Sequence, residues 1–503
     1  MQRPPVTLLV LGAFAALLAL LPIGYLLLRL VDGYERALAE LMRPRTLELS
    51  WNTLALTLAV AITALALGFF QAWLTTRTNL PFARAFAVLA TLPLAIPSYV
   101  LALGYLSIFP GLSGFFPSWI TLSVATAPYV FLAVSAAMMR LSPATEEVSR
   151  SLGYSRWQTL ARITWPQVRP AATASLLLVI LYTLSEFGAV SLLRFDTFTR
   201  AIYNAYRGSF DRTAAASLAL MLVLLTILVI VIERRYRGDY LSAPPQAARR
   251  RKIELGSARI PFALLLFGFA AISVLMPVLA LAGWSVAGTS TANLLELATA
   301  LIGSVNVAVF AGLIIGVFAI AIGIWNLRYH SRFSALIEGT SWAAHALPAI
   351  VVALALVFVG ANLLPGIYQT IWLLLAAYVI LFLPNALSAV ATPLAQVPRS
   401  IEQVSRSLGM SQAKTLIRVV LPISAPGIVA GVSLAALTVL KELPATLLLR
   451  PTGYETLATE LWAATENLAY AQAAPYALAL IIIAGAPALL LNAQARKLVS
   501  EVS

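Results

Sequence analysis

Twelve long apolar stretches dominate the sequence. Each is about as long as a helix must be to cross the hydrocarbon core of a bilayer, which takes about 20 residues. They are apolar on all sides, without the alternation typical of barrel strands, so the sequence predicts an all-α polytopic membrane protein with twelve transmembrane helices. The stretches lie near residues 7–29, 52–74, 86–109, 118–138, 171–193, 213–232, 260–283, 302–325, 337–360, 369–391, 426–449 and 474–493.

Composition excludes the main alternative classes. Hydrophobic residues make up 60% of the 503 residues and charged residues only 11%, whereas a soluble protein has about 45–50% and about 25%. The net charge of +14 is compatible with nucleic-acid binding only if the basic residues share one face. They lie instead in short loops between apolar stretches, so we expect a lipid bilayer as partner and no nucleic acid.

The basic residues also orient the chain. Lys and Arg are about three times more numerous on the side that holds the N-terminus, and such an excess marks the cytoplasmic side. We therefore expect both termini in the cytoplasm. The first stretch is expected to remain as an anchor, because Asp32, Glu35 and Arg36 separate it from the small residues at 37–39 that could resemble a cleavage site.

A polar segment occurs twice in nearly the same form. Residues 146–153 read EEVSRSLG and residues 402–409 read EQVSRSLG, and other prolines and glutamates repeat at the same offset. Because each half holds an even number of stretches, the duplication predicts two parallel six-span repeats. The predicted domains are a first repeat, residues 1–237, a cytoplasmic basic linker, residues 238–259, and a second repeat, residues 260–503.

The linker contains a basic run, Arg249 to Lys252. Such a run can bind anionic lipid headgroups. The alternative is a solvated loop whose charge only sets the topology, and we favour this second interpretation.

The repeated segment lies between the fourth and fifth stretches of each half and is longer than a simple connection requires. Its pattern predicts two short helices separated by a glycine, Gly153 or Gly409, which tolerates positive φ. A glutamate and an arginine four residues apart are expected to share one exposed helix face: Glu146 with Arg150, and Glu402 with Arg406. Pro166 and Pro422 are expected to end the segment before the next span.

The two segments resemble the coupling loop of ATP-binding-cassette importer permeases. That pattern is Glu-Ala-Ala, three residues, Gly, nine residues, then Ile-x-Leu-Pro. The matching residues are Glu147, Gly153, Ile163 and Pro166 in the first half, and Gly409, Leu421 and Pro422 in the second. Val-Ser replaces the two alanines in both halves. In the second half Gln403 stands at the position of the glutamate. The resemblance covers essentially the whole chain, as a fused pair of permease domains.

The resemblance implies that these loops dock on a separate cytoplasmic ATPase, in two copies, which uses ATP and Mg. The chain itself is then a transport subunit with no cofactor, and not an enzyme. It has no Gly-x-x-x-x-Gly-Lys-Ser/Thr phosphate-binding loop, since the stretch from Gly409 to Thr415 lacks the second glycine. The residues assigned to coupling are Glu146, Glu147, Arg150, Gly153, Pro166, Glu402, Gln403, Arg406, Gly409 and Pro422.

Three charged residues stand out within the apolar stretches: Glu186, Lys441 and Glu442. Each costs about 2.5–3.5 kcal/mol to insert, so each should face the bundle interior. A continuous helix from Glu186 to Arg194 would rise roughly 12 Å, which puts the glutamates in the outer half of the membrane. Lys441 can pair with Glu186 as a structural bridge, and the three residues can line a translocation path; these two interpretations do not exclude each other. In the second case Glu186 and Glu442 are transient oxygen ligands for a hard cation.

The residues around these glutamates are similar to the iron(III) branch of the permeases. The similar segments are residues 186–189, 194–203 and 441–451. The resemblance implies ferric iron as substrate, delivered by a periplasmic binding protein to a bacterial inner membrane. Permeases for thiamine, polyamines and oxyanions share the architecture and remain alternatives. An ion-coupled secondary transporter is the alternative from another class, but it leaves the repeated loop unexplained.

Polar and aromatic residues follow the two glutamates. They are either a docking face for the binding protein or simple anchors at the membrane interface. The candidate docking residues are Arg194, Asp196, Arg450 and Glu455.

Overall fold

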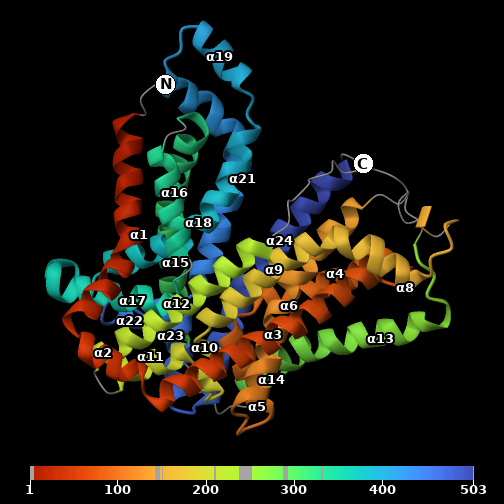
Figure 1. Cartoon of the computed structure of the whole chain (residues 1–503), viewed down its shortest axis with the longest axis horizontal. Coiled ribbons are helices and arrows are strands. Elements are labelled where there is room, and N and C mark those ends of the chain that lie inside the picture. Colours follow the sequence, from red (N-terminus) through yellow and green to blue (C-terminus); the bar gives the residue numbers. More distant parts are fainter. Residues whose placement is uncertain are drawn as a thin grey trace. The chain divides into compact units, whose positions relative to one another are not determined.

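The computed structural model describes residues 5–141, 148–149, 151–208, 211–236, 252–286, 293–329, 332–345 and 347–501. Within these ranges the chain is helical apart from turns and one isolated β-bridge (Figure 1). The described residues contain nine helices long and apolar enough to cross a membrane, and two bent helix pairs raise the number to 11. A shorter apolar helix covers Tyr470–Gly485. All twelve predicted stretches fall on these helices.

The chain divides into two compact units, and each gathers segments from both predicted halves. The first unit comprises Met1–Leu41, Ala205–Leu220 and Ala292–Ala463, and the second comprises Met42–Asn204, Met221–Thr291 and Ala464–Ser503. The compact units are therefore not the two sequence repeats, whose boundaries stay a prediction. Boundaries between the two units fall within three of the described helices: α11 (Phe198–Arg207), α12 (Arg212–Tyr236) and α23 (Leu457–Glu466).

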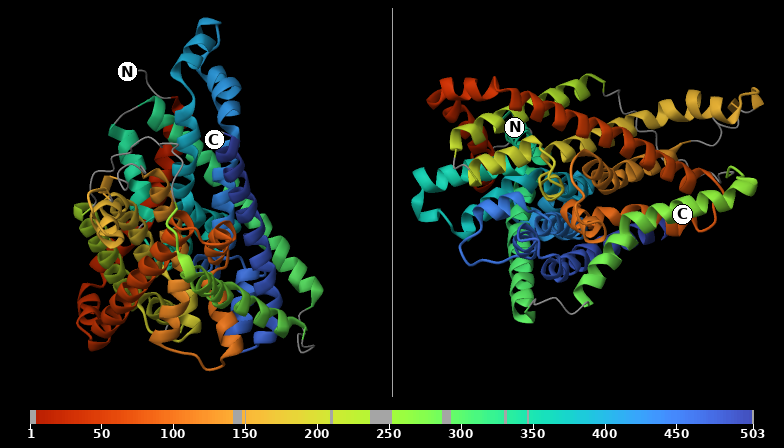
Figure 2. Two further views of the ribbon diagram at one scale, coloured as in Figure 1. Left: turned by 90° about the vertical axis from the view of Figure 1, so that its right-hand side faces the viewer. Right: turned by 90° about the horizontal axis from the view of Figure 1, so that it is seen from below.

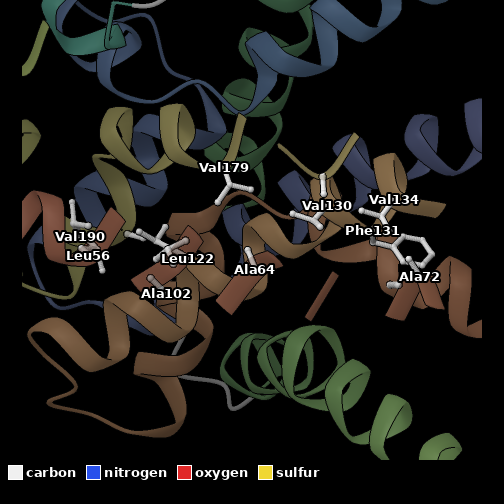
Figure 3. Close-up of a cluster of buried hydrophobic side chains, with 14 of the residues drawn as sticks. Leu56, Ala64, Ala72, Ala102, Leu122, Val130, Phe131, Val134, Val179 and Val190 are labelled. Carbon is white, nitrogen blue, oxygen red and sulfur yellow. The ribbon is translucent and has the colours of Figure 1, made fainter. Parts of the chain in front are cut away.

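The second unit is built around three long helices that pack against one another, α3 (Pro44–Arg77), α6 (Phe115–Arg140) and α9 (Trp165–Ser185). Its core, shown in Figure 3, mixes large and small side chains from these helices and from shorter neighbouring helices. Small residues let helix backbones approach closely, which matters in a bilayer because the lipid is as apolar as the helices. The other helices of this unit are α4 (Ala83–Thr91), α5 (Ser98–Ile108), α8 (Arg156–Thr159), α10 (Gly188–Leu192), α13 (Arg259–Ala270), α14 (Met276–Val286) and α24 (Tyr470–Glu501).

Gly68 sits at the closest approach of α3 and α6. A Cβ at this position would lie 2.6 Å from Val130 Cβ and 2.7 Å from the carbonyl oxygen of Ala127. Overpacking of this kind costs about 1–3 kcal/mol, so we expect Gly68→Ala to lower the apparent melting temperature of the purified protein in detergent. Gly24→Ala in α1 is the matched control, because nothing lies within 4 Å of a Cβ there. Equal melting temperatures for the two variants would contradict the prediction.

In the first unit α15 (Leu294–Arg328), α18 (Ile371–Gln396) and α21 (Leu421–Leu440) pack together. Helix α1 (Val6–Asp32) packs on α15 and on the two helices that follow it. At Gly12 a Cβ would lie 2.5 Å from the ring of the buried Trp325, so α1 and α15 meet without space for a side chain. The other helices of this unit are α2 (Tyr34–Leu41), α16 (Arg332–His345), α17 (Ala349–Phe358), α19 (Arg399–Ser407), α20 (Gln412–Thr415) and α22 (Pro444–Leu449).

The predicted linker is described from Lys252 onward. Its end forms the β-bridge with the residue after α3: the Ile253 N–H donates to the carbonyl of Arg77 at 2.9 Å, and the Asn79 N–H donates to the carbonyl of Ile253 at 3.0 Å. The Asn79 side chain then accepts from the Leu255 N–H at 3.0 Å. The linker is thus attached to the second unit where it joins α13. Arg249 to Arg251 lie outside the described residues, so the choice between lipid binding and a solvated loop stays open.

Candidate functional site

The second copy of the repeated loop consists of α19, a glycine turn and α20. Gly409 has φ 84°, the Met410 N–H donates to the Ser405 carbonyl at 3.2 Å, and the Gly409 N–H donates to the Arg406 carbonyl at 3.0 Å. These two bonds form a Schellman motif, which ends a helix at a residue of positive φ. In the first loop Gly153 has φ 85°, so the glycine break that the sequence predicts is confirmed in both halves.

A pair of hydroxyl groups joins the two short helices of each loop. Ser405 Oγ lies 3.1 Å from Thr415 Oγ1, and Ser149 Oγ lies 3.0 Å from Thr159 Oγ1 at the equivalent place. All four residues are buried. The serines occupy the position of the second alanine in the Glu-Ala-Ala pattern, so this departure from the pattern gives each loop an internal hydrogen bond.

The expectation that Pro166 and Pro422 end the loop is wrong. Each proline lies within a helix that runs on into the span, and one turn of π-helix precedes it, at Leu160–Thr164 and at Leu416–Val420. The residue before each proline bonds to the carbonyl five residues earlier instead of four. The wider turn accommodates a ring and a missing N–H that would otherwise break the helix.

The two loops present apolar side chains to the outside. Val404 on α19 and Leu408 directly after it are one helical turn apart and are 58% and 78% exposed. Their equivalents Val148 and Leu152 are 57% and 72% exposed. Helix α19 extends beyond the ends of α16 and α18, as Figure 1 and the left view of Figure 2 show. An apolar face on a helix of this kind suits a protein partner.

Glu402 differs from the expectation of an exposed pair with Arg406. Its carboxylate turns inward and lies 2.5 Å from the guanidinium of Arg328, and only 18% of its side chain is exposed. Arg406 and Gln403 remain exposed. Burial raises the pKa of the nearby Tyr329 hydroxyl, and the Glu402 carboxylate raises it further. The corresponding residues of the first loop, Glu146, Glu147 and Arg150, lie outside the described residues.

Glu186 and Glu442 lie at breaks between helices and not inside continuous ones. Helix α9 ends at Ser185 and α10 begins at Gly188, while α21 ends at Leu440 and α22 begins at Pro444. The expectation of a continuous helix from Glu186 to Arg194 is therefore wrong, and the depth of the glutamates in the membrane stays a prediction. Pro444 suits the first position of α22, where its missing N–H costs nothing.

Each glutamate caps the short helix that follows it. Glu442 Oε1 accepts from the Ala445 N–H at 2.8 Å, and Oε2 accepts from the Thr446 N–H at 2.9 Å. The Thr446 hydroxyl lies 2.7 Å from Oε2, and 2.8 Å from the hydroxyl of Tyr378. Lys441 has a partner as well. A carboxylate at a helix N-terminus satisfies donors that no water reaches.

Glu186 is held in the same way. Its Oε1 accepts from the Ala189 N–H at 2.9 Å and its Oε2 accepts from the Ser98 hydroxyl at 2.9 Å. Both glutamates are buried, 7% and 8% exposed. Among the described residues no group of three His, Cys, Asp or Glu side chains could hold a metal ion.

The candidate docking residues differ between the halves. Arg194 is exposed and has a φ of 51°, which is uncommon for a side chain of this size. Asp196 pairs with Arg200. Arg450, the equivalent of Arg194, is bound: it donates to Thr459 at 2.9 Å and to Glu460 at 3.1 Å. Glu455 is half-buried. Arg194 is thus the arginine that remains available at the surface.

Sequence reasoning missed several partners of these residues. Ser98 and Tyr378, which support the two caps, carry no motif and lie in apolar stretches. Arg328 could have been noticed, because it is a charge directly after the predicted stretch 302–325. Its partner on α19 depends on how two distant helices pack.

Comparison with known proteins gives matches to transport permeases. The family described as binding-protein-dependent transport system inner membrane component matches residues 64–237 and again residues 308–503. The chain is 34% identical to the Fe(3+)-transport system permease protein FbpB 2 of Haemophilus influenzae, over 99% of this chain and 100% of that protein. It is 24% identical to the ferric transport system permease protein FbpB of Actinobacillus pleuropneumoniae, over 76% and 61%. It is 26% identical to the sulfate transport system permease protein CysT of Escherichia coli, over 43% and 86%.

Proposed function

Because the chain belongs to the family of binding-protein-dependent transport system inner membrane components, present here as two fused copies, we propose that it carries iron(III) into the cytoplasm as the permease of an ATP-binding-cassette importer. The observation that carries this proposal is the repeated loop with its exposed apolar face. The full-length similarity to an Fe(3+)-transport permease favours iron as the substrate. Such a permease is a multi-pass inner-membrane protein and a transport subunit rather than an enzyme.

The partners belong to the proposal. Two copies of a cytoplasmic ATPase dock on the two loops, at residues Glu146 to Pro166 and Glu402 to Pro422, and use ATP and Mg. The chain itself binds no cofactor, and both its termini lie in the cytoplasm. A periplasmic binding protein delivers the iron, and we propose Arg194 as its first contact, with Asp196, Arg450 and Glu455 as the other docking residues. The exposed arginine with its uncommon backbone conformation supports the choice of Arg194.

Glu186, Lys441 and Glu442 remain our proposed path residues. In the conformation described here both carboxylates bind helix N–H groups, and the positive end of a helix dipole disfavours a cation at the same place. A role as transient iron ligands therefore requires the glutamates to leave their caps during transport.

The test is uptake of radiolabelled ferric iron in the native host with the gene deleted and then restored. We expect uptake under iron starvation to fall on deletion and to return with the gene. Labelled sulfate, thiamine and a polyamine are measured in the same strains. If deletion leaves iron uptake unchanged but lowers uptake of one of the other compounds, the iron assignment is contradicted. The chain would then belong to an importer of that compound. Purification of the tagged chain without an ATPase would favour an ion-coupled secondary transporter.

A further inference from the structure

Two arginines connect α15 and α19 in opposite directions. Arg328 is the last residue of α15, and its Nη2 lies 2.5 Å from Glu402 Oε1 and 3.4 Å from the carbonyl oxygen of Leu394 near the end of α18. Arg399 is the first residue of α19, and its Nη2 donates to the carbonyl of Leu327 at 3.2 Å. We call these contacts the arginine clasp. All of its residues belong to the first compact unit.

The Arg328–Glu402 pair of the clasp is largely buried, whereas the contact of Arg399 with the Leu327 carbonyl is exposed. Only 11% of the Arg328 side chain and 18% of the Glu402 side chain are exposed, so solvent screens the pair less than it screens a surface pair. Removing Arg328 or Glu402 leaves the other charge partly buried without its partner. This costs more free energy than the intact pair contributes to stability. Arg399 adds a cation at the C-terminal end of α15, where the helix dipole and a terminal carbonyl favour it.

The chain joins the loop directly to two spans, α18 and α21. The clasp links the loop to a third span, α15. Helix α19 is joined covalently to α18 on one side and to α20 and α21 on the other. Helix α15 has no such connection, although it packs on α18, on α21 and on α1. The clasp therefore provides direct polar bonds between α19 and α15.

We propose that the arginine clasp makes α15 move together with α19, and that Glu402 is a positioning residue bound to Arg328 rather than a contact for the ATPase. This inference rests on the proposed function, in which α19 receives the motion of the ATPase. Gln403, which stands at the glutamate position of the family pattern, is exposed and faces the partner in place of Glu402.

The test uses the intact transporter, purified by a tag on this chain and reconstituted in proteoliposomes, and measures ATP hydrolysed per iron transported. Arg328→Gln and Glu402→Gln are expected to raise this ratio by about 2- to 30-fold, the range of measured coupling effects. The double variant Arg328→Glu, Glu402→Arg is expected to bring it back toward the wild-type value. Glu296→Gln, which removes a charge from an exposed residue in the first turn of α15, is the control and should leave the ratio unchanged. An unchanged ratio in both single variants, or no recovery in the double variant, overturns the inference.

A second measurement does not depend on the cargo. The chain has no cysteine, so spin labels can be attached specifically at Ser407→Cys on α19 and Leu313→Cys on α15, both exposed positions. We expect the distance distribution between them to broaden when Arg328→Gln is added, and an unchanged distribution counts against the clasp. If wild-type transporter moves no iron, the iron assignment fails, and this measurement still decides on the clasp.

Discussion

Glu442→Ala is expected to leave little folded protein in the membrane, whereas Glu442→Gln is expected to leave a substantial fraction. The alanine variant leaves the buried N–H groups of Ala445 and Thr446 without their acceptor, while the Thr446 hydroxyl keeps the backbone carbonyl of residue 442 at 2.9 Å. Each buried donor left without a partner costs about 1–3 kcal/mol. Glutamine keeps one carbonyl oxygen as acceptor, so it preserves part of the cap. The measurement is the yield and apparent melting temperature of the purified chain.

The glutamine variants also separate the two roles of these residues. If Glu186 and Glu442 act only as caps, the double glutamine variant transports iron in proportion to the amount of folded protein. If a carboxylate is needed on the path, transport per folded molecule falls although the protein is present.

Glu296→Ala is the control for the yield of Glu442→Ala, because Glu296 lies in the first turn of α15 but is exposed. A normal yield of Glu442→Ala would contradict the cap.

Aspartate at Val404 and Leu408 together is expected to abolish docking of the ATPase copy that binds the second loop. Burying an aliphatic side chain of this size contributes about 1.5–3 kcal/mol, and the two side chains are 58% and 78% exposed in the free loop. Losing both contacts should weaken docking by about 100-fold or more, since about 1.4 kcal/mol corresponds to a factor of ten. The measurement is the amount of ATPase that copurifies with the tagged chain, and iron uptake should fall with it.

Ser407→Asp is the matched control for the docking face. Ser407 is an exposed polar residue of the same helix, so an added charge there tests the effect of charge alone. We expect this variant to retain the ATPase. Equal retention by the Val404→Asp, Leu408→Asp double variant and by Ser407→Asp would mean that the apolar face is not the docking surface.

The helices and the repeated loop could be predicted because their signals are local. Apolar stretches of spanning length identify the helices, and Gly153 and Gly409 mark a turn that few other residues adopt. The breaks at Glu186 and Glu442 escape this reasoning, since the surrounding residues are apolar enough to continue a span. A cap is recognised only when the carboxylate is seen to accept from the following N–H groups. The π-turns before Pro166 and Pro422 are missed for a similar reason, because proline normally signals the end of a helix.

The orientation of side chains in the loop depends on tertiary contacts. Glu402 and Gln403 are adjacent, and the sequence gives no basis for deciding which of them faces the protein. Arg328 decides it by its place at the end of α15. The composition of the two compact units is hidden in the same way, because nothing local in α1 indicates that it packs on α15.

The β-bridge at Ile253 bears on the order of events during synthesis. The edge that receives Ile253 is the turn after α3, which leaves the ribosome long before the linker does. The bridge attaches the chain to that turn at Ile253, a few residues before α13 begins at Arg259. The turn after α3 therefore provides the backbone groups to which the later linker bonds. If the turn at Arg77 to Asn79 is misfolded, the start of α13 loses this attachment.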